Sequence, residues 1–190
     1  MKSDIDALMQ ERDLDAILVV GPAQHNPPMH YLTGGGHLTH AMLIKKRGAE
    51  PMLFHNSMER EEAASTGLNT TNLDVYGIEK LLKQAGGDVL QASVMRYQRM
   101  LADVGITGGR MAIYGKSDAG ESYAIFSALQ EAVPELTIIG ELQDSVLLTA
   151  MATKDDPEIE RIRRMGQITT QVVGKVADYL TYHRVRDEVL

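Results

Sequence analysis

A short, continuous apolar run near the N-terminus limits this chain to a small set of folds. The run is Asp15-Ala-Ile-Leu-Val-Val20, and Gly21-Pro22 closes it. Every position after the aspartate is apolar, which predicts a strand without a solvent-facing side. Such a strand needs cover on both faces of its sheet. The run therefore indicates an α/β protein in which helices pack on each side of a central sheet.

Other short apolar runs between turn residues predict the rest of the sheet. They cover residues 41–44, 51–54, 73–76, 110–114 and 136–139. The first two flank the polar segment 45–50, as in an antiparallel hairpin. The segments between the later runs predict helices, which implies parallel strand pairs. We expect a mixed, mainly parallel sheet whose core includes Ile17, Val19, Leu43, Ile44, Leu53, Ile113 and Ile138.

Helices are predicted where apolar residues recur at three- and four-residue steps. The first follows a cap at Ser3 or Asp4, and the others cover residues 59–64, 78–84, 89–104 and 122–132. Asn26-Pro27-Pro28 is expected to form a loop outside regular structure. Methionine occurs 11 times at scattered apolar positions, which favours a packing role.

A long amphipathic helix is predicted at the C-terminal end. Asp156 is its expected N-cap, Pro157 suits the first helical position, and the helix runs to about Arg186, or about 45 Å. Its apolar stripe consists of Ile159, Ile162, Met165, Ile168, Val172, Val173, Val176, Tyr179 and Leu180. Because that stripe must be buried, we expect the helix to open a second domain, with a boundary between residues 150 and 155.

Composition narrows the possible partners. Hydrophobic residues make up 44% of the chain, enough for a real core. Lys and Arg total 19 against 26 Asp and Glu, a net charge of -7 that argues against nucleic acid. The chain has no cysteine, lacks the apolar segment of a signal peptide and has no apolar run near the ~18 residues of a membrane span. We expect a cytoplasmic protein.

Two stretches resemble the Xaa-Pro aminopeptidase, prolidase and creatinase family. Lys154-Asp-Asp-Pro-Glu-Ile-Glu-Arg-Ile-Arg-Arg164 is similar to the segment that opens the family's catalytic domain. The apolar run at 15–20 and Met29-His-Tyr-Leu-Thr-Gly34 are similar to its N-terminal domain. The resemblance implies a creatinase/prolidase-type N-terminal domain at 1–150. Residues 151–190 would be the linker and first helix of a missing catalytic domain.

The same resemblance sets expectations for chemistry. The family's hydrolases cleave next to proline, or a C–N bond of a small amide, with two divalent metal ions (Mn, Co or Zn) held by two Asp, one His and two Glu. Past Arg164 the only possible ligands here are Asp178, His183, Asp187 and Glu188. We therefore expect no catalytic or metal-binding residue in this chain. Its role would be to dimerise the enzyme and shape a cleft for a proline-containing peptide or small amide.

The family places the residues after Tyr-Leu-Thr-Gly near the substrate cleft, sometimes that of the neighbouring subunit. The corresponding candidates here are Tyr31, Gly35, Gly36, His37 and His40. Relatives usually carry an aromatic residue after the first glycine, where this chain has Gly35. His37 and His40 could substitute for that aromatic contact.

Several other readings compete with this one. The histidines at 25, 30, 37, 40 and 55 could form a metal site, but no His-Glu-x-x-His pair supports it. Gly34-Gly-Gly36 lacks the spacing and lysine of a phosphate loop, and Ser117, Asp118 and Ser122 near Tyr114 lack a nucleophile elbow. The alternative to a peptidase domain is a stand-alone binding or scaffold protein that has lost the catalytic half. A reading frame continuing past Leu190 would favour the peptidase-domain interpretation.

Overall fold

The computed structural model describes residues 4–183. The chain forms two compact units, Met1–Met151 and Ala152–Leu190. Before the last two helices, the elements in chain order are α1 (Ile5–Glu11), β1 (Ala16–Gly21), α2 (Pro27–Thr33), β2 (Ala41–Lys46), β3 (Met52–His55), η1 (Ser57–Glu59), α3 (Arg60–Ser65), β4 (Asn69–Asn72), η2 (Leu73–Tyr76), α4 (Ile78–Gln84), α5 (Val89–Asp103), β5 (Gly109–Gly115), α6 (Ala119–Ala132) and β6 (Leu136–Ile139). Helices α7 (Val146–Ala152) and α8 (Asp156–Tyr182) follow.

The strands form one six-stranded sheet in the order β4-β3-β2-β1-β5-β6. Strand β1 is therefore central, and it pairs antiparallel with β2 and parallel with β5. The β2–β3 pair is antiparallel, whereas β3–β4 and β5–β6 are parallel. These pairings confirm the mixed, mainly parallel sheet.

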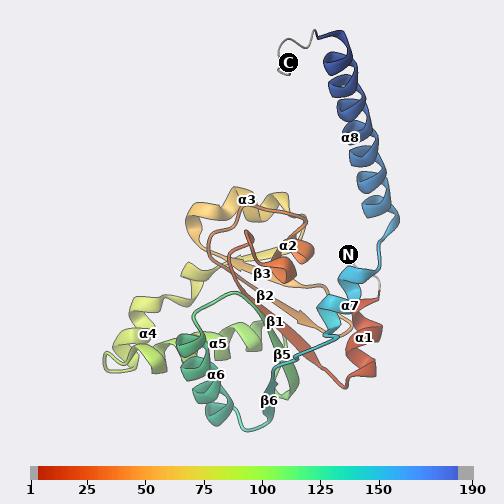
Figure 1. The fold of residues 1–190 in the computed structure, drawn as a ribbon. Coiled ribbons are helices and arrows are strands. Elements are labelled where there is room, and N and C mark those ends of the chain that lie inside the picture. Colours follow the sequence, from red (N-terminus) through yellow and green to blue (C-terminus); the bar gives the residue numbers. More distant parts are fainter. Residues whose placement is uncertain (1–3, 184–190) are drawn as a thin grey trace. The chain divides into compact units, whose positions relative to one another are not determined.

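The side chains of β1 alternate between two hydrophobic clusters, one on each face of the sheet. Helices α1 and α7 lie on one side of the sheet, and α5 and α6 lie on the other (Figure 1). Ile17 and Val19 join the cluster that holds residues of α1, α2 and α7. Leu18 and Val20 join the cluster that holds residues of α5 and α6. Residues 16–20 are all buried, as expected of a strand covered on both sides.

Two predicted segments have a different structure. Pro27 and Pro28 do not form a loop but occupy the first turn of α2, where an amide hydrogen has no intrahelical partner to lose. Residues 73–76 are a 3₁₀-helix, and the strand lies just before them at Asn69–Asn72. The Asn72 side chain accepts a hydrogen bond from Asp74 N at 2.9 Å, which ends the strand and starts this turn. Val75 is accordingly exposed.

The predicted core is only partly right. Ile17, Val19, Leu43, Ile44 and Leu53 are buried, but Ile113 and Ile138 are half-buried because they lie toward the β6 edge of the sheet. Helix α6 begins at Ala119 rather than Ser122, since Asp118 caps it. Lys45 belongs to β2 and not to the turn. Its ammonium group is buried and bonds Asp6 Oδ1 at 2.5 Å.

Helix α8 confirms the long amphipathic helix, with one correction at its start. Asp155, not Asp156, is the N-cap, and its backbone N–H donates to the Glu158 carboxylate at 3.0 Å. Asp156 and Pro157 fall within the first turn. All nine stripe residues are at least 40% exposed. The expected end at Arg186 and the possible cap at Ser3 lie outside the described residues. Within residues 4–183, no helix is long and apolar enough to cross a membrane.

Candidate functional site

The loop after α2 is shaped by glycines. Gly34 ends the helix in a left-handed conformation with φ 71°, and Gly35 follows with φ 99°. A Cβ at position 35 would lie 3.2 Å from the His30 ring. An aromatic residue there would be strained and would press on this imidazole. This packing gives a local reason for glycine at position 35.

The five predicted cleft residues do not share one pocket. Tyr31 donates its hydroxyl to Ala150 O at 2.8 Å and lines a hollow of about 420 Å³ beside the segment 66–69. A Cβ at Gly36 would meet Thr66 Cγ2 at 3.3 Å. His37 is exposed, and its Nδ1 lies 3.4 Å from Gln24 Nε2. His40 lines a separate cavity at the end of β1.

A buried carboxylate anchors the segment between these two histidines. Glu59 Oε1 accepts hydrogen bonds from Thr39 N and Thr39 Oγ1, both at 2.5 Å. Its other oxygen accepts from Asn56 Nδ2 at 3.0 Å. Bonds to an ionised group are stronger than neutral ones. Glu59 therefore fixes the course of the chain from His37 to His40.

The cavity that contains His40 opens where β1 and β5 end, and its volume is about 200 Å³. Here the two backbones approach closely. A Cβ at Gly21 would lie 2.0 Å from Lys116 O, and one at Gly115 would lie 2.0 Å from Val20 O. Lys116 N also donates to Val20 O at 3.0 Å. Only glycine permits this approach, and beyond it the two chains diverge.

The segment after β5 caps a helix. Asp118 Oδ1 accepts from Glu121 N at 2.9 Å, and the hydroxyls of Ser117 and Ser122 lie 2.5 Å apart. Among the described residues no imidazole or carboxylate is hydrogen-bonded to either serine. The arrangement supports the capping interpretation over a nucleophile.

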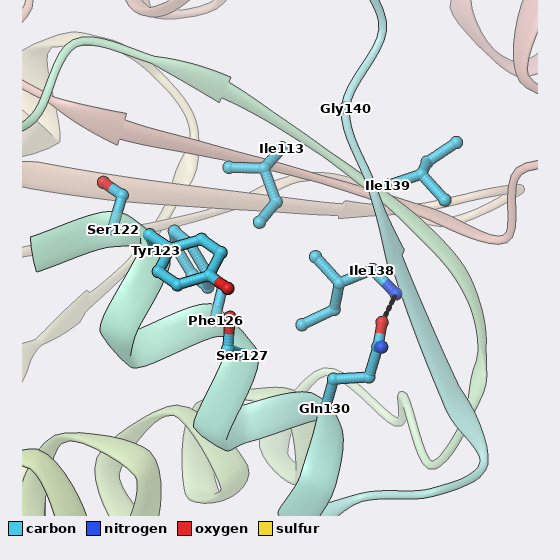
Figure 2. Close-up of a pocket in the computed structure, with 9 residues that line it drawn as sticks. All are labelled: Ile113, Ser122, Tyr123, Phe126, Ser127, Gln130, Ile138, Ile139 and Gly140. Atoms are coloured by element: carbon cyan, nitrogen blue, oxygen red, sulfur yellow. Dashed lines mark hydrogen bonds between the residues drawn. The ribbon is translucent and has the colours of Figure 1, made fainter. Parts of the chain in front are cut away.

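A third hollow, of about 350 Å³, lies between α6 and the edge strand β6 (Figure 2). Ile113, Phe126 and Ile138 supply its apolar floor, with Tyr123 and Ser127 on the helix beside it. Gln130 Oε1 accepts from Ile138 N at 2.7 Å, which occupies a backbone donor on the open edge. Covering edge groups in this way hinders pairing with another strand.

No metal centre is assembled within residues 4–183: no group of three or more His, Asp or Glu side chains is close enough to hold an ion. His55 is buried, and its Nδ1 lies 2.7 Å from Asn56 O. The His, Asp and Glu side chains of residues 4–183 therefore do not fit a two-metal site. Asp187 and Glu188, considered above as possible ligands, lie outside the described residues.

The charged residues of the β1–β5 cavity were not among the predicted site residues. Arg96 comes from α5, Lys116 follows β5, and Glu121 lies in the first turn of α6. One sequence signal was present, because Gly115-Lys116-Ser117 stands between a predicted strand and a predicted helix. For Arg96, which lies within a predicted helix, no sequence pattern indicated a place in a site.

Comparison with known proteins identifies similar sequences and folds. The family described as Creatinase/Prolidase N-terminal domain matches residues 3–146. A dipeptidase from Pyrococcus horikoshii OT3 is 17% identical with a TM-score of 0.60, covering 96% of this chain and 44% of that one. A prolidase from the same organism is 16% identical with a TM-score of 0.50, covering 90% and 40%. No curated protein matches the sequence.

An X-Pro aminopeptidase from Thermotoga maritima MSB8 is 14% identical with a TM-score of 0.50, covering 84% of this chain and 38% of that one. At such identities the structural likeness shows the fold alone. The present chain spans less than half the length of each of these three proteins.

Replacing Glu59 should loosen the loop that carries His37 and His40. In Glu59→Gln, the amide nitrogen cannot accept hydrogen bonds, so we expect a loss of roughly 1.5–3 kcal/mol in unfolding free energy. Amide hydrogen exchange at Thr39 should also become faster. The exposed Glu62, changed to Gln, is the matched control and should stay within about 0.5 kcal/mol. Equal effects in the two variants would contradict the anchoring role.

Proposed function

Because the chain belongs to the creatinase/prolidase N-terminal domain family, we propose that it acts as the non-catalytic N-terminal domain of a Xaa-Pro-peptidase-like metallohydrolase. The observation that carries this proposal is the family match over residues 3–146, which contains the whole six-stranded sheet. Residues 4–183 contain no cluster of metal-ligating side chains, which favours a structural role over a catalytic one. Hydrolysis of a proline-containing peptide or small amide would belong to a separate catalytic domain with two divalent ions (Mn, Co or Zn).

In this proposal the loop after α2 borders the substrate cleft. His37 is exposed, and the Glu59 anchor limits how far the segment can move. A fixed polar loop of this kind would orient a substrate without taking part in bond cleavage. Tyr31 would instead hold α2 against α7 through its bond to Ala150.

We also propose that the 190-residue chain, when it is not joined to a catalytic domain, pairs with a second copy along α8. Among residues 153–183, α8 is the only helix or strand, so the described part of this unit contains no second element that could cover the apolar stripe. Burying a Val, Leu or Ile side chain is worth roughly 1.5–3 kcal/mol, so the stripe represents on the order of 10 kcal/mol. A two-fold helix pair is self-complementary and is the commonest solution for identical chains.

The pairing predicts a dimer in light scattering of the 190-residue chain. Changing Val172 and Val176 to Asp places charges in the stripe and should yield a monomer. The same charge added on the opposite face, by changing Gln167 and Gln171 to Asp, should leave the dimer intact. A chain cut after Lys154 should also be monomeric. A monomeric unmodified chain, or equal behaviour of both double variants, would rule out pairing through this stripe.

The supporting role predicts weak metal binding and no peptidase activity for this chain alone. Calorimetric titration with Mn²⁺ or Zn²⁺ should show no stoichiometric site with a Kd below about 1 µM, because such affinity requires several convergent ligands. Incubation with an Xaa-Pro dipeptide and either metal should release no proline. A stoichiometric site tighter than about 1 µM, or release of proline, would overturn this prediction.

A further inference from the structure

The cavity where β1 and β5 end lies at a change of direction in the fold. After β1 the chain enters α2, which contributes Met29 to one cluster. After β5 it enters α6, which contributes Leu129 to the cluster on the other face. Since β1 and β5 are parallel neighbours, their carboxyl ends separate at this point. Ligands of open α/β sheets bind in the crevice formed at such a switch point.

Charges of both signs face this cavity without pairing with each other. Arg96, Lys116 and Glu121 line it, and none of the three takes part in an ion pair within residues 4–183. Arg96 Nε is also shielded from solvent and has no hydrogen-bond acceptor among the described residues. A buried donor of this kind normally has a partner. In the other carboxylate, Asp118, Oδ1 accepts a hydrogen bond from the Glu121 backbone amide.

The rest of the cavity is largely apolar. Met42, Ile125 and Phe126 form part of its wall, and His40 lies at the start of β2. Tyr97 is 4% exposed. Burial raises the pKa of Tyr97 to about 12, with Arg96 acting to lower it and Glu121 to raise it. Tyr97 is therefore neutral at pH 7. Of the two carboxylates that line the cavity, that of Glu121 has no hydrogen-bond partner within residues 4–183.

We propose that this cavity binds a small zwitterion, namely a free α-amino acid with an apolar side chain. Arg96 and Lys116 would receive the carboxylate, for which the guanidinium offers a two-pronged donor edge. Glu121 would receive the ammonium group. The apolar wall would contact the side chain, and a volume of about 200 Å³ suits a residue of medium size. This site is independent of the role proposed above for the domain.

The probe is L-valine, titrated into the 190-residue chain by calorimetry. We expect saturable one-site binding with a Kd of about 10 µM to 1 mM, as for a ligand with few atoms and two charged contacts. Two analogues divide the contacts: 3-methylbutanoate lacks the ammonium group, and isobutylamine lacks the carboxylate. Each should bind at least tenfold more weakly than valine.

Matched variants locate the site. Arg96→Gln and Glu121→Gln should each weaken valine binding at least tenfold. Arg99→Gln on α5 and Glu131→Gln on α6 make the same charge changes outside the cavity, and should stay within twofold. The Glu121 carboxylate has no hydrogen-bond partner among the described residues, so its variant decides the question even if Arg96→Gln fails to fold. Absence of saturable binding below about 10 mM, analogues as tight as valine, or equal losses in control variants would each overturn the proposal.

Discussion

The close approach of β1 and β5 at their carboxyl ends is the constraint on which the rest of the domain depends. Gly21 and Gly115 bring the two backbones nearer than any side chain would allow. Val20 O then accepts hydrogen bonds from Lys116 N at 3.0 Å and from Asn26 Nδ2 at 2.9 Å. The second bond ties the entry of α2 to the same point. One carbonyl thus fixes both chains just before they part to opposite faces of the sheet.

This geometry separates the domain's surfaces. The chain leaving β1 forms α2 and the glycine loop that Glu59 anchors, whereas the chain leaving β5 forms the capped start of α6. The β1–β5 cavity lies between them, and the hollow of about 350 Å³ lies between α6 and β6 (Figure 2). The polar groups at these places mostly cap helices or anchor loops. Such an arrangement is consistent with a domain that binds and positions, as we propose.

The parts of the fold that local sequence determines could be predicted. The apolar run of β1, the hairpin and helix α5 each carry a clear pattern, and their existence and type were right. Two predictions of secondary structure were wrong because a few residues formed local turns or helix starts that residue type alone did not reveal. Pro27 and Pro28 suit a first helical turn as well as a loop, and Asn72 turned an apolar segment into a 3₁₀-helix.

The sites were less predictable than the fold. Glu59 follows β3 and accepts a hydrogen bond from Thr39, which lies 20 residues earlier. This contact forms only in the folded chain, so the sequence does not reveal it. The cavity likewise combines Arg96, Lys116 and Glu121 from different elements, with His40 from the start of β2. No single stretch of sequence contains that combination. The predicted cleft residues shared one stretch, yet Tyr31 and His40 lie in different hollows.

The most direct test of the central constraint is the cost of adding one methyl group where the strands meet. Gly115 (φ 117°) and Gly86 (φ 62°) both have positive φ, but a Cβ at Gly86 meets nothing within 4 Å. Urea unfolding of the two alanine variants therefore compares a positive-φ position that also clashes with Val20 O with one that has open space around it. We expect Gly115→Ala to cost at least about 3 kcal/mol more than Gly86→Ala, or to prevent folding. Equal losses in the two variants would contradict the account.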